Sequence, residues 1–143
     1  MLIIFEGMDK TGKTSLINEF NKRTNFKHIV LDRGAISSYV YDAIYERGNR
    51  EKYDFFVDMV KKVPHIVFLC IAKDSTIMKR LECANEKLPE KQKEIGIERI
   101  KGLFIEEAAI SGLNFMLINT EYDFDETVDS LANFIEEYEG EQK

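Results

Sequence analysis

The chain contains few of the residues that mark specialised classes of protein. It has two prolines, eight glycines and two cysteines among 143 residues. So few prolines and glycines rule out a low-complexity chain. The two cysteines have no CxxC spacing, which argues against a disulfide framework or a metal site. We therefore expect Cys70, which lies inside an apolar run, to be a core thiol and Cys83 to be a helix residue in a reducing compartment.

Long apolar runs and an excess of positive charge are also missing. The longest apolar run, residues 66–72, is far shorter than the roughly 20 residues that span a bilayer. The chain enters an apolar strand without a basic region or a cleavage site, so we expect no secretion signal. A net charge of −6 argues against a large nucleic-acid surface, although one site can still be locally positive. These features predict one cytoplasmic domain over residues 1–143.

A glycine-rich loop near the start of the chain is the most informative stretch. Residues 7–14 read G-x-x-x-x-G-K-T, follow the apolar run 2–5 and lead into an amphipathic segment. Strand, glycine loop and helix in this order are the context of a phosphate-binding loop, or P-loop. The alternative is a chance turn between a strand and a helix. We prefer the P-loop because the pattern is flanked on both sides as a P-loop requires.

Each residue type in this loop suits the binding of a nucleoside triphosphate. Gly7 and Gly12 let the backbone curl so that its N–H groups point at phosphate oxygens, and the following helix adds the positive end of its dipole. Lys13 can reach the β- and γ-phosphates, and Thr14 offers a hydroxyl to Mg²⁺. The loop residues that we predict to bind ATP are Gly7, Met8, Asp9, Lys10, Thr11, Gly12, Lys13, Thr14 and Ser15.

A second strand, predicted over residues 28–33, ends in the charged pair Asp32 and Arg33. A carboxylate that a buried strand projects toward the Mg²⁺ of a P-loop is the Walker B arrangement. Ligands of open α/β sheets lie at the carboxyl ends of the strands, where both Asp32 and the P-loop are expected. We therefore predict that Asp32 supports the metal. The alternative is a salt-bridged pair with no function beyond the strand end.

Strands and helices alternate along the rest of the chain. This alternation implies a small parallel sheet of about four strands with helices on both faces, and right-handed crossovers limit it to the doubly wound type. The fold class is therefore predicted as α/β, a three-layer sandwich of the P-loop NTPase type. Strands are expected at 2–6, 28–33, 64–71 and 114–118, and helices at 13–23, 37–47, 53–62, 74–84, 95–110 and 125–139.

The least apolar stretch of the chain is residues 82–94. It contains Lys87, Pro89, Lys91 and Lys93 among four glutamates and one glutamine. One interpretation is a solvated loop between frayed helix ends. The other is a mobile lid, over residues 85–95, that closes over the triphosphate and supplies cations. Both interpretations stay open at the level of the sequence.

Four stretches carry a resemblance to a known family. Residues 5–14 read F-E-G-M-D-K-T-G-K-T, and residues 32–41 contain D-R followed by two serines and a tyrosine. They resemble the F-E-G-x-D-G-x-G-K-[ST] and D-R-x-x-x-S-x-x-x-Y segments of thymidylate kinases and, more broadly, of P-loop deoxynucleoside monophosphate kinases. Residues 71–81 and 98–108 are similar to the elements before and after the lid of that family. The likeness covers most of the chain, and only the P-loop is specific by itself.

The resemblance implies a phosphotransferase that moves the γ-phosphoryl group of ATP, with Mg²⁺, to a (deoxy)nucleoside monophosphate such as dTMP. It implies that Asp9 faces the acceptor sugar or a metal-linked water and that Arg33 grips the acceptor phosphate. The resemblance therefore implies that the catalytic residues are Lys13, Asp9, Asp32 and Arg33, and that the metal ligands are Thr14 and Asp32. It implies that the acceptor is bound by Arg33, Ser37, Ser38 and Tyr41. It also implies that Arg80, Asn119 and Thr120 lie beside the donor adenine.

The acceptor side departs from the family. Only 24 residues, 8–31, separate Gly7 from Asp32, which leaves no room for the strand, helices and Arg-Glu-Pro segment that family members carry there. The lid region has lysines where the family commonly has arginines. A short P-loop kinase of this kind suits a phage genome, and the acceptor site is the part of the prediction most affected.

Other functions therefore stay open. One is a P-loop kinase of another acceptor, such as a nucleoside, a polynucleotide 5′ end or a modified base in DNA. Another is a non-catalytic nucleotide-binding module, against which Asp9, Asp32 and Arg33 argue because binding alone needs no acceptor-facing arginine. We expect ATP and a small nucleotide as partners and no membrane. The negative net charge of the chain disfavours a long nucleic acid as a partner. A homodimer is the assembly to test.

Overall fold

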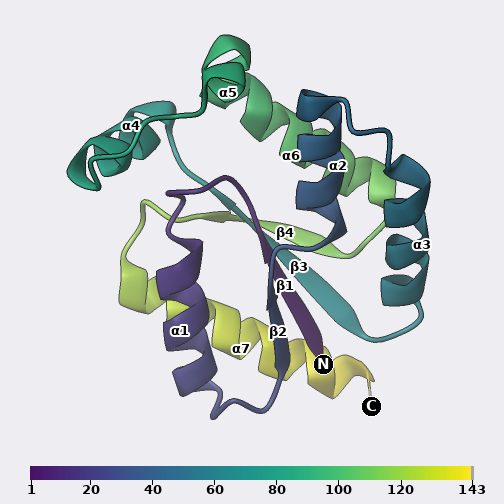
Figure 1. The fold of residues 1–143 in the computed structure, drawn as a ribbon. Helices are drawn as coiled ribbons and strands as arrows, with labels where there is room; N and C mark the ends of the chain where they lie inside the picture. Colours follow the sequence, from purple (N-terminus) through teal and green to yellow (C-terminus); the bar gives the residue numbers. More distant parts are fainter. Residues whose placement is uncertain (143) are drawn as a thin grey trace.

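A computed structural model describes residues 1–142 of the protein, and only Lys143 lies outside the described part. The strands are β1 (Leu2–Glu6), β2 (Ile29–Asp32), β3 (His65–Ile71) and β4 (Phe115–Asn119). They form one sheet in the order β2-β1-β3-β4, and each neighbouring pair is parallel (Figure 1). The predicted α/β class with a small parallel sheet is therefore confirmed.

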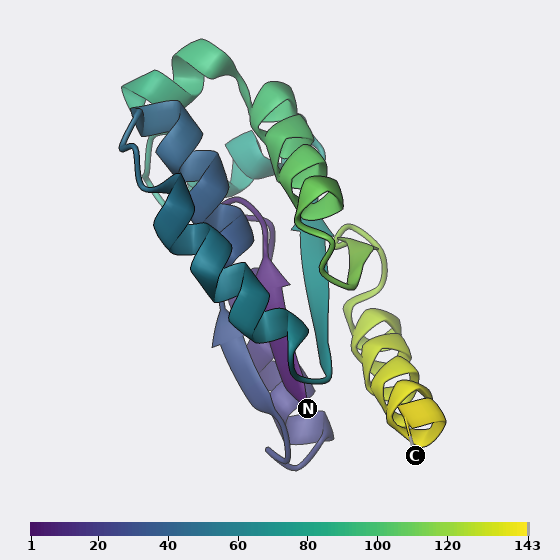
Figure 2. The same ribbon diagram turned by 90° about the vertical axis from the view of Figure 1, so that its right-hand side faces the viewer.

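Helices cover both faces of the sheet and make three layers. They are α1 (Lys13–Arg23), α2 (Ala35–Tyr45), α3 (Arg50–Lys61), α4 (Asp74–Cys83), α5 (Glu90–Ile95), α6 (Ile97–Ser111) and α7 (Phe124–Gln142). α1 and α7 lie on one face, whereas α2, α3 and α6 lie on the other, which faces the viewer in Figure 2. Within residues 1–142, none of these helices is long and apolar enough to cross a membrane.

The central strand β1 is buried on both sides, which explains its unbroken apolar run. Ile3 and Phe5 belong to an apolar cluster with Phe20 of α1, and Ile4 belongs to a second cluster with Val40 of α2. Successive side chains of a strand point to opposite faces, so a strand between two helical layers has no polar side. This packing holds the start of the P-loop rigidly between the two layers.

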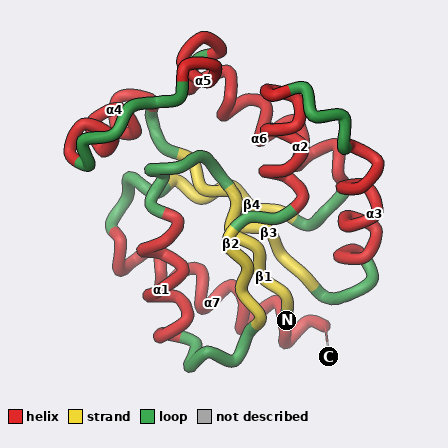
Figure 3. Tube along the Cα trace, in the orientation of Figure 1, coloured by secondary structure: helices red, strands yellow, loops and turns green. Residues whose placement is uncertain are grey.

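The connections after β1, β3 and β4 lie at one end of the sheet, as the green segments of Figure 3 show. This is the carboxyl end of the parallel strands, where α/β sheets bind their ligands. β2 ends beside β1, because Asp32 pairs in register with Phe5. The sheet therefore brings together the predicted P-loop and the predicted Walker B strand.

The start of α2 differs from its prediction. The helix begins at Ala35 rather than at residue 37, and Gly34, the residue before it, has no side chain that could cap it. Its first backbone N–H groups are instead bound by the side chain of Glu6, which accepts hydrogen bonds from the amides of Gly34 and Ser37. A cap supplied by a residue of another element leaves no local sequence signal.

Two further helix ends differ by about one turn, and one helix was not predicted. α3 begins at Arg50 rather than at residue 53, and α7 continues to Gln142 rather than ending at 139. Both added turns are polar, and apolar periodicity does not detect a polar turn. The short helix α5 lies within the stretch predicted as a polar loop or lid.

Candidate functional site

The loop between β1 and α1 needs glycine at two positions for different reasons. Gly7 has φ +132°, and a Cβ added there would lie 2.4 Å from the carbonyl oxygen of Cys70 in β3. Gly12 has φ +89° and occupies the position just before α1, a left-handed conformation that side chains disfavour. Thr11 closes the loop on itself, because its hydroxyl donates to the carbonyl oxygen of Met8 at 2.7 Å.

The lysine that follows this loop lies beside the carboxylate that ends β2. Lys13 is 6% exposed, and its Nζ is 3.7 Å from Oδ1 of Asp32. The Asp32 side chain is half exposed, at 51%, so it stays accessible to a ligand. Thr14, the next residue along α1, is exposed at the same helix end. The structure therefore brings the predicted lysine and carboxylate together, with Thr14 next to the lysine at the start of α1.

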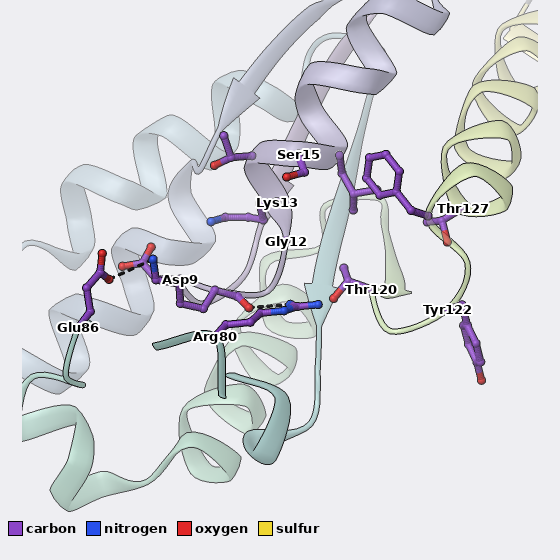
Figure 4. Close-up of a pocket in the computed structure, with 13 residues that line it drawn as sticks. Asp9, Gly12, Lys13, Ser15, Arg80, Glu86, Thr120, Tyr122 and Thr127 are labelled. Atoms are coloured by element: carbon purple, nitrogen blue, oxygen red, sulfur yellow. Dashed lines mark hydrogen bonds and ion pairs between the residues drawn. The ribbon is translucent and has the colours of Figure 1, made fainter. Parts of the chain in front are cut away.

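A cavity of about 760 Å³ opens over the loop (Figure 4). Arg80 of α4 reaches it and donates from Nη1 to the carbonyl oxygen of Lys10 at 2.7 Å. Thr120, just after β4, forms another part of the wall. Asn119, the last residue of β4, was also predicted beside the donor but does not line the cavity. Its side-chain oxygen accepts the backbone N–H of Glu121 at 3.0 Å.

Sequence reasoning missed several residues of this wall. Glu86, Tyr122, Phe124 and Thr127 also line the cavity, with Glu86 and Tyr122 at its two ends in Figure 4. Glu86 forms an ion pair with Lys10 at 3.1 Å. Residues 122–127 could have been found from their position in the chain, because they follow the carboxyl end of the last predicted strand, where ligands of such sheets bind.

Arg33 connects this region to a second cavity. It has φ +72°, an uncommon conformation for a residue with a side chain. Its backbone N–H donates to the carbonyl oxygen of Phe5 at 2.8 Å. Its guanidinium pairs with the exposed carboxylate of Asp9 and lies 5.6 Å from the ring centroid of Tyr41. The predicted pair of loop aspartate and strand-end arginine is therefore in direct contact.

The second cavity, of about 490 Å³, lies between the start of α2 and the start of α3. Of the described residues that line it, three are cationic and none is acidic, in a chain whose net charge is −6. All four predicted acceptor residues are part of its wall. The full lining is Arg33, Gly34, Ala35, Ser37, Ser38, Tyr41, Arg47, Lys52, Tyr53 and Phe56.

Two of the predicted acceptor hydroxyls are already used within the protein. Ser37 is 4% exposed, and its hydroxyl donates to Oε1 of Glu6 at 2.5 Å. The hydroxyl of Ser38 donates to the carbonyl oxygen of Gly34 at 3.2 Å. Sequence reasoning missed Arg47 and Lys52, because the pattern around them indicated only the end of one helix and the approach to the next.

A buried carboxylate ends β1, directly before the P-loop. Glu6 is 0% exposed, and burial raises the pKa of its carboxyl, while hydrogen bonds from Ser37 and Gly34 and the charge of Lys13 oppose the rise.

Burial also raises the pKa of the Cys70 thiol in β3, to about 12, so Cys70 is a protonated core thiol at neutral pH.

Solved structures resemble this fold, although no protein-family model and no curated protein matches the sequence. The YorR protein from Bacillus subtilis, in complex with phosphorylated GDP, has a TM-score of 0.74 and 21% identity over 95% of this chain and 96% of that one. Deoxyadenosine kinase from M. mycoides has a TM-score of 0.64 and 14% identity with products dCMP and dCDP bound, over 96% of this chain and 100% of that one. With dATP bound it has a TM-score of 0.60 and 15% identity, covering 95% and 100%. These similarities establish a shared fold over almost the whole chain.

Proposed function

We propose that this protein is an ATP-dependent nucleotide kinase that transfers the γ-phosphoryl group to a (deoxy)nucleoside monophosphate. One observation carries the proposal: the cavity over the P-loop and the cavity lined by cations meet at the contact between Asp9 and Arg33. Phosphoryl transfer needs a donor and an acceptor side by side, with positive charge around the transferring group. Deoxyadenosine kinase, one of the similar folds, supports phosphoryl transfer as the reaction. Its name and its dCMP product indicate a nucleoside acceptor, so the choice of a monophosphate rests on the second cavity of this protein.

On the donor side, Lys13 would hold the β- and γ-phosphates of ATP. Thr14 and Asp32 would hold Mg²⁺ through oxygen atoms, the ligands that this ion prefers. Residues 1–142 contain no group of three or more acidic, histidine or cysteine side chains that could form a metal cage. This fits Mg²⁺, which is usually held by one or two protein oxygens together with substrate phosphates. When bound, the ion would neutralise charge on the phosphates.

The donor base would lie at the far end of the same cavity. Arg80 and Thr120 would border the adenine, as the family resemblance implies, and Tyr122 and Phe124 add aromatic surface there. Asn119 would act indirectly, because its side chain holds the turn after β4. ATP is therefore the donor that we propose.

On the acceptor side, the charge of the cavity favours a phosphorylated acceptor. A neutral nucleoside offers no charge for cations to bind, whereas a monophosphate offers a dianion for Arg33 to grip through two hydrogen bonds. Arg47 and Lys52 lie in the same wall and would take over from the absent Arg-Glu-Pro segment. The rings of Tyr41, Tyr53 and Phe56 would pack against the sugar or base. The acceptor that we propose is dTMP or a similar deoxynucleotide.

A panel of acceptors tests this function. The protein is incubated with ATP, Mg²⁺ and nucleoside monophosphates, nucleosides or oligonucleotides, and ADP and products are separated by chromatography. We expect transfer to at least one monophosphate and none to nucleosides. Lys13→Ala should abolish transfer while circular dichroism shows an intact fold. Transfer only to nucleosides or to oligonucleotide 5′ ends would contradict the proposal.

A further inference from the structure

Glu6 is a fully buried carboxylate that lines neither of the two cavities. It is the last residue of β1, directly before the P-loop. Removing a carboxylate from water is unfavourable unless hydrogen bonds or charges compensate for it. Neither the donor phosphates nor the acceptor would touch Glu6, so its presence has to be explained by what it holds.

All three hydrogen bonds that Glu6 accepts come from the start of α2. Oε1 accepts the backbone N–H of Gly34 at 3.0 Å and the hydroxyl of Ser37 at 2.5 Å. Oε2 accepts the backbone N–H of Ser37 at 2.7 Å. Bonds to an ionised acceptor are stronger than neutral ones, and a carboxylate beside a helix N-terminus also complements the helix dipole. Glu6 therefore caps α2 from another element.

The segment held in this way includes the arginine that we place at the acceptor phosphate. Arg33 directly precedes Gly34, and its own N–H is bound by the carbonyl oxygen of Phe5. Two successive residues of β1, Phe5 and Glu6, thus hold the backbone on both sides of the Arg33 side chain. This bracketing keeps Arg33 in its left-handed conformation, at φ +72°.

We propose that Glu6 is a positioning residue that sets Arg33 and the start of α2 at a defined place relative to the P-loop. The inference rests on the proposed function, because it concerns the acceptor half of that site. The same residue ends the donor strand and holds the acceptor segment, so one side chain sets the spacing between the two substrates. Small displacements of reacting groups are costly in transfer reactions, where rate depends on alignment.

Glu6→Gln tests the inference, because glutamine keeps the size but has only one accepting oxygen. Initial rates are measured with ATP and acceptor varied separately, and ATP binding is measured directly by calorimetry. We expect kcat/KM for the acceptor to fall roughly ten- to hundredfold, while the Kd for ATP changes less than about twofold. Glu6→Asp retains the charge and should restore part of the loss.

Glu107→Gln is the matched control. Glu107 is also mostly buried, at 13% exposed, and accepts two hydrogen bonds from Arg50, but it lines neither substrate cavity. The Glu107→Gln variant should lower the stability of the protein without changing the KM for the acceptor. If Glu6→Gln does not fold, Ser37→Ala removes one of the three bonds and should shift the acceptor KM in the same direction by less.

Hydrogen exchange separates this inference from the proposed function. The amides of Gly34 and Ser37 should exchange faster in Glu6→Gln than in the wild type, whether or not transfer occurs. An active wild type whose acceptor kinetics and exchange are unchanged by Glu6→Gln would overturn the positioning role alone. Equal losses of ATP and acceptor binding would overturn it as well. A wild type that transfers to no monophosphate would overturn the proposed function, and the exchange rates would then decide whether Glu6 holds the segment.

Discussion

Arg33 combines an unfavourable backbone conformation with contacts to both halves of the site. A left-handed conformation costs a residue with a side chain roughly 1–3 kcal/mol, which the surrounding hydrogen bonds have to offset. In return, the guanidinium lies between Asp9 of the P-loop and the ring of Tyr41 in the second cavity. At the scale of single residues, Arg33 is where the proposed donor and acceptor sides meet.

Replacing Arg33 should therefore separate the two substrates kinetically. Arg33→Ala should raise the acceptor KM roughly 10- to 100-fold, the loss of a hydrogen bond to a charged group, with a smaller effect on the KM for ATP. Arg33→Lys should recover little, because an ammonium cannot form the paired bonds of a guanidinium. Initial-rate measurements check this. Arg99→Ala is the control, since Arg99 is exposed and pairs with Glu106 on the same helix; equal effects of the two alanine variants would contradict the role.

Two glycines of the chain should respond in opposite ways to alanine. At Gly7 the new Cβ would meet the backbone of β3 at 2.4 Å, so Gly7→Ala should destabilise the protein by roughly 2 kcal/mol or more and weaken ATP binding. At Gly102, inside α6, nothing lies within 4 Å, so Gly102→Ala should stabilise by up to about 1 kcal/mol. Urea unfolding measures both changes. A tolerated Gly7→Ala would show that the loop can shift away from β3.

Among the elements, α5 and the loop before it contact both the P-loop and α2. Glu86 pairs with Lys10 of the P-loop at 3.1 Å. The amide of Gln92 in α5 donates to the hydroxyl of Tyr45 in α2 at 3.0 Å, and Lys91 lies 6.0 Å from the same ring. The lid over residues 85–95 remains a prediction, and these contacts are the ones that its closure would change.

Nucleotide binding should slow hydrogen exchange in this segment. With ATP and Mg²⁺ present, the amides of residues 85–95 should exchange more slowly than in the free protein, because a closed lid is better ordered. Mass spectrometry of the peptides measures the effect, and residues 128–135 of α7 serve as an internal reference. Equal exchange with and without nucleotide would identify the segment as an ordinary surface loop.

The start of α2 shows why a helix boundary is missed when only the sequence of the helix itself is considered. Ser37 and Ser38 are good local capping residues, yet the helix begins before them because Glu6 binds its first amides. The polar first turn of α3 was missed for a related reason, since periodicity follows apolar residues only. The central strands β1 and β3 were well predicted because each is an almost unbroken apolar run that is buried in the sheet.

For the whole molecule, the sheet places the proposed donor and acceptor cavities at the same edge. The homodimer and the cytoplasmic location remain predictions at this scale. One face of α3 and the residues after it carry Phe55, Met59 and Val63, which are 68%, 52% and 45% exposed. Phe55 and Met59 are spaced by four and share one face of α3. A second copy that covered these two side chains and Val63 would remove this apolar surface from water.

Light scattering tests the assembly. A homodimer gives twice the monomer mass of 16.6 kDa, and Phe55→Asp should return the protein to that mass if this face forms the interface. Phe26→Asp is the control, because Phe26 is equally exposed, at 70%, but lies in the turn after α1. A mass of 16.6 kDa at every concentration would contradict the dimer.

The sequence by itself determined the order of strands and helices, the P-loop at residues 7–14 and the neighbouring Asp32 and Arg33. These are local properties, since periodicity, glycine spacing and a charge at a strand end are all written in consecutive residues. Only the tertiary structure decided that Glu6 holds the start of α2 and that Arg47 joins Arg33 in one cavity. Those contacts join residues far apart in the chain, and they depend on strand order and helix packing, which no local pattern records.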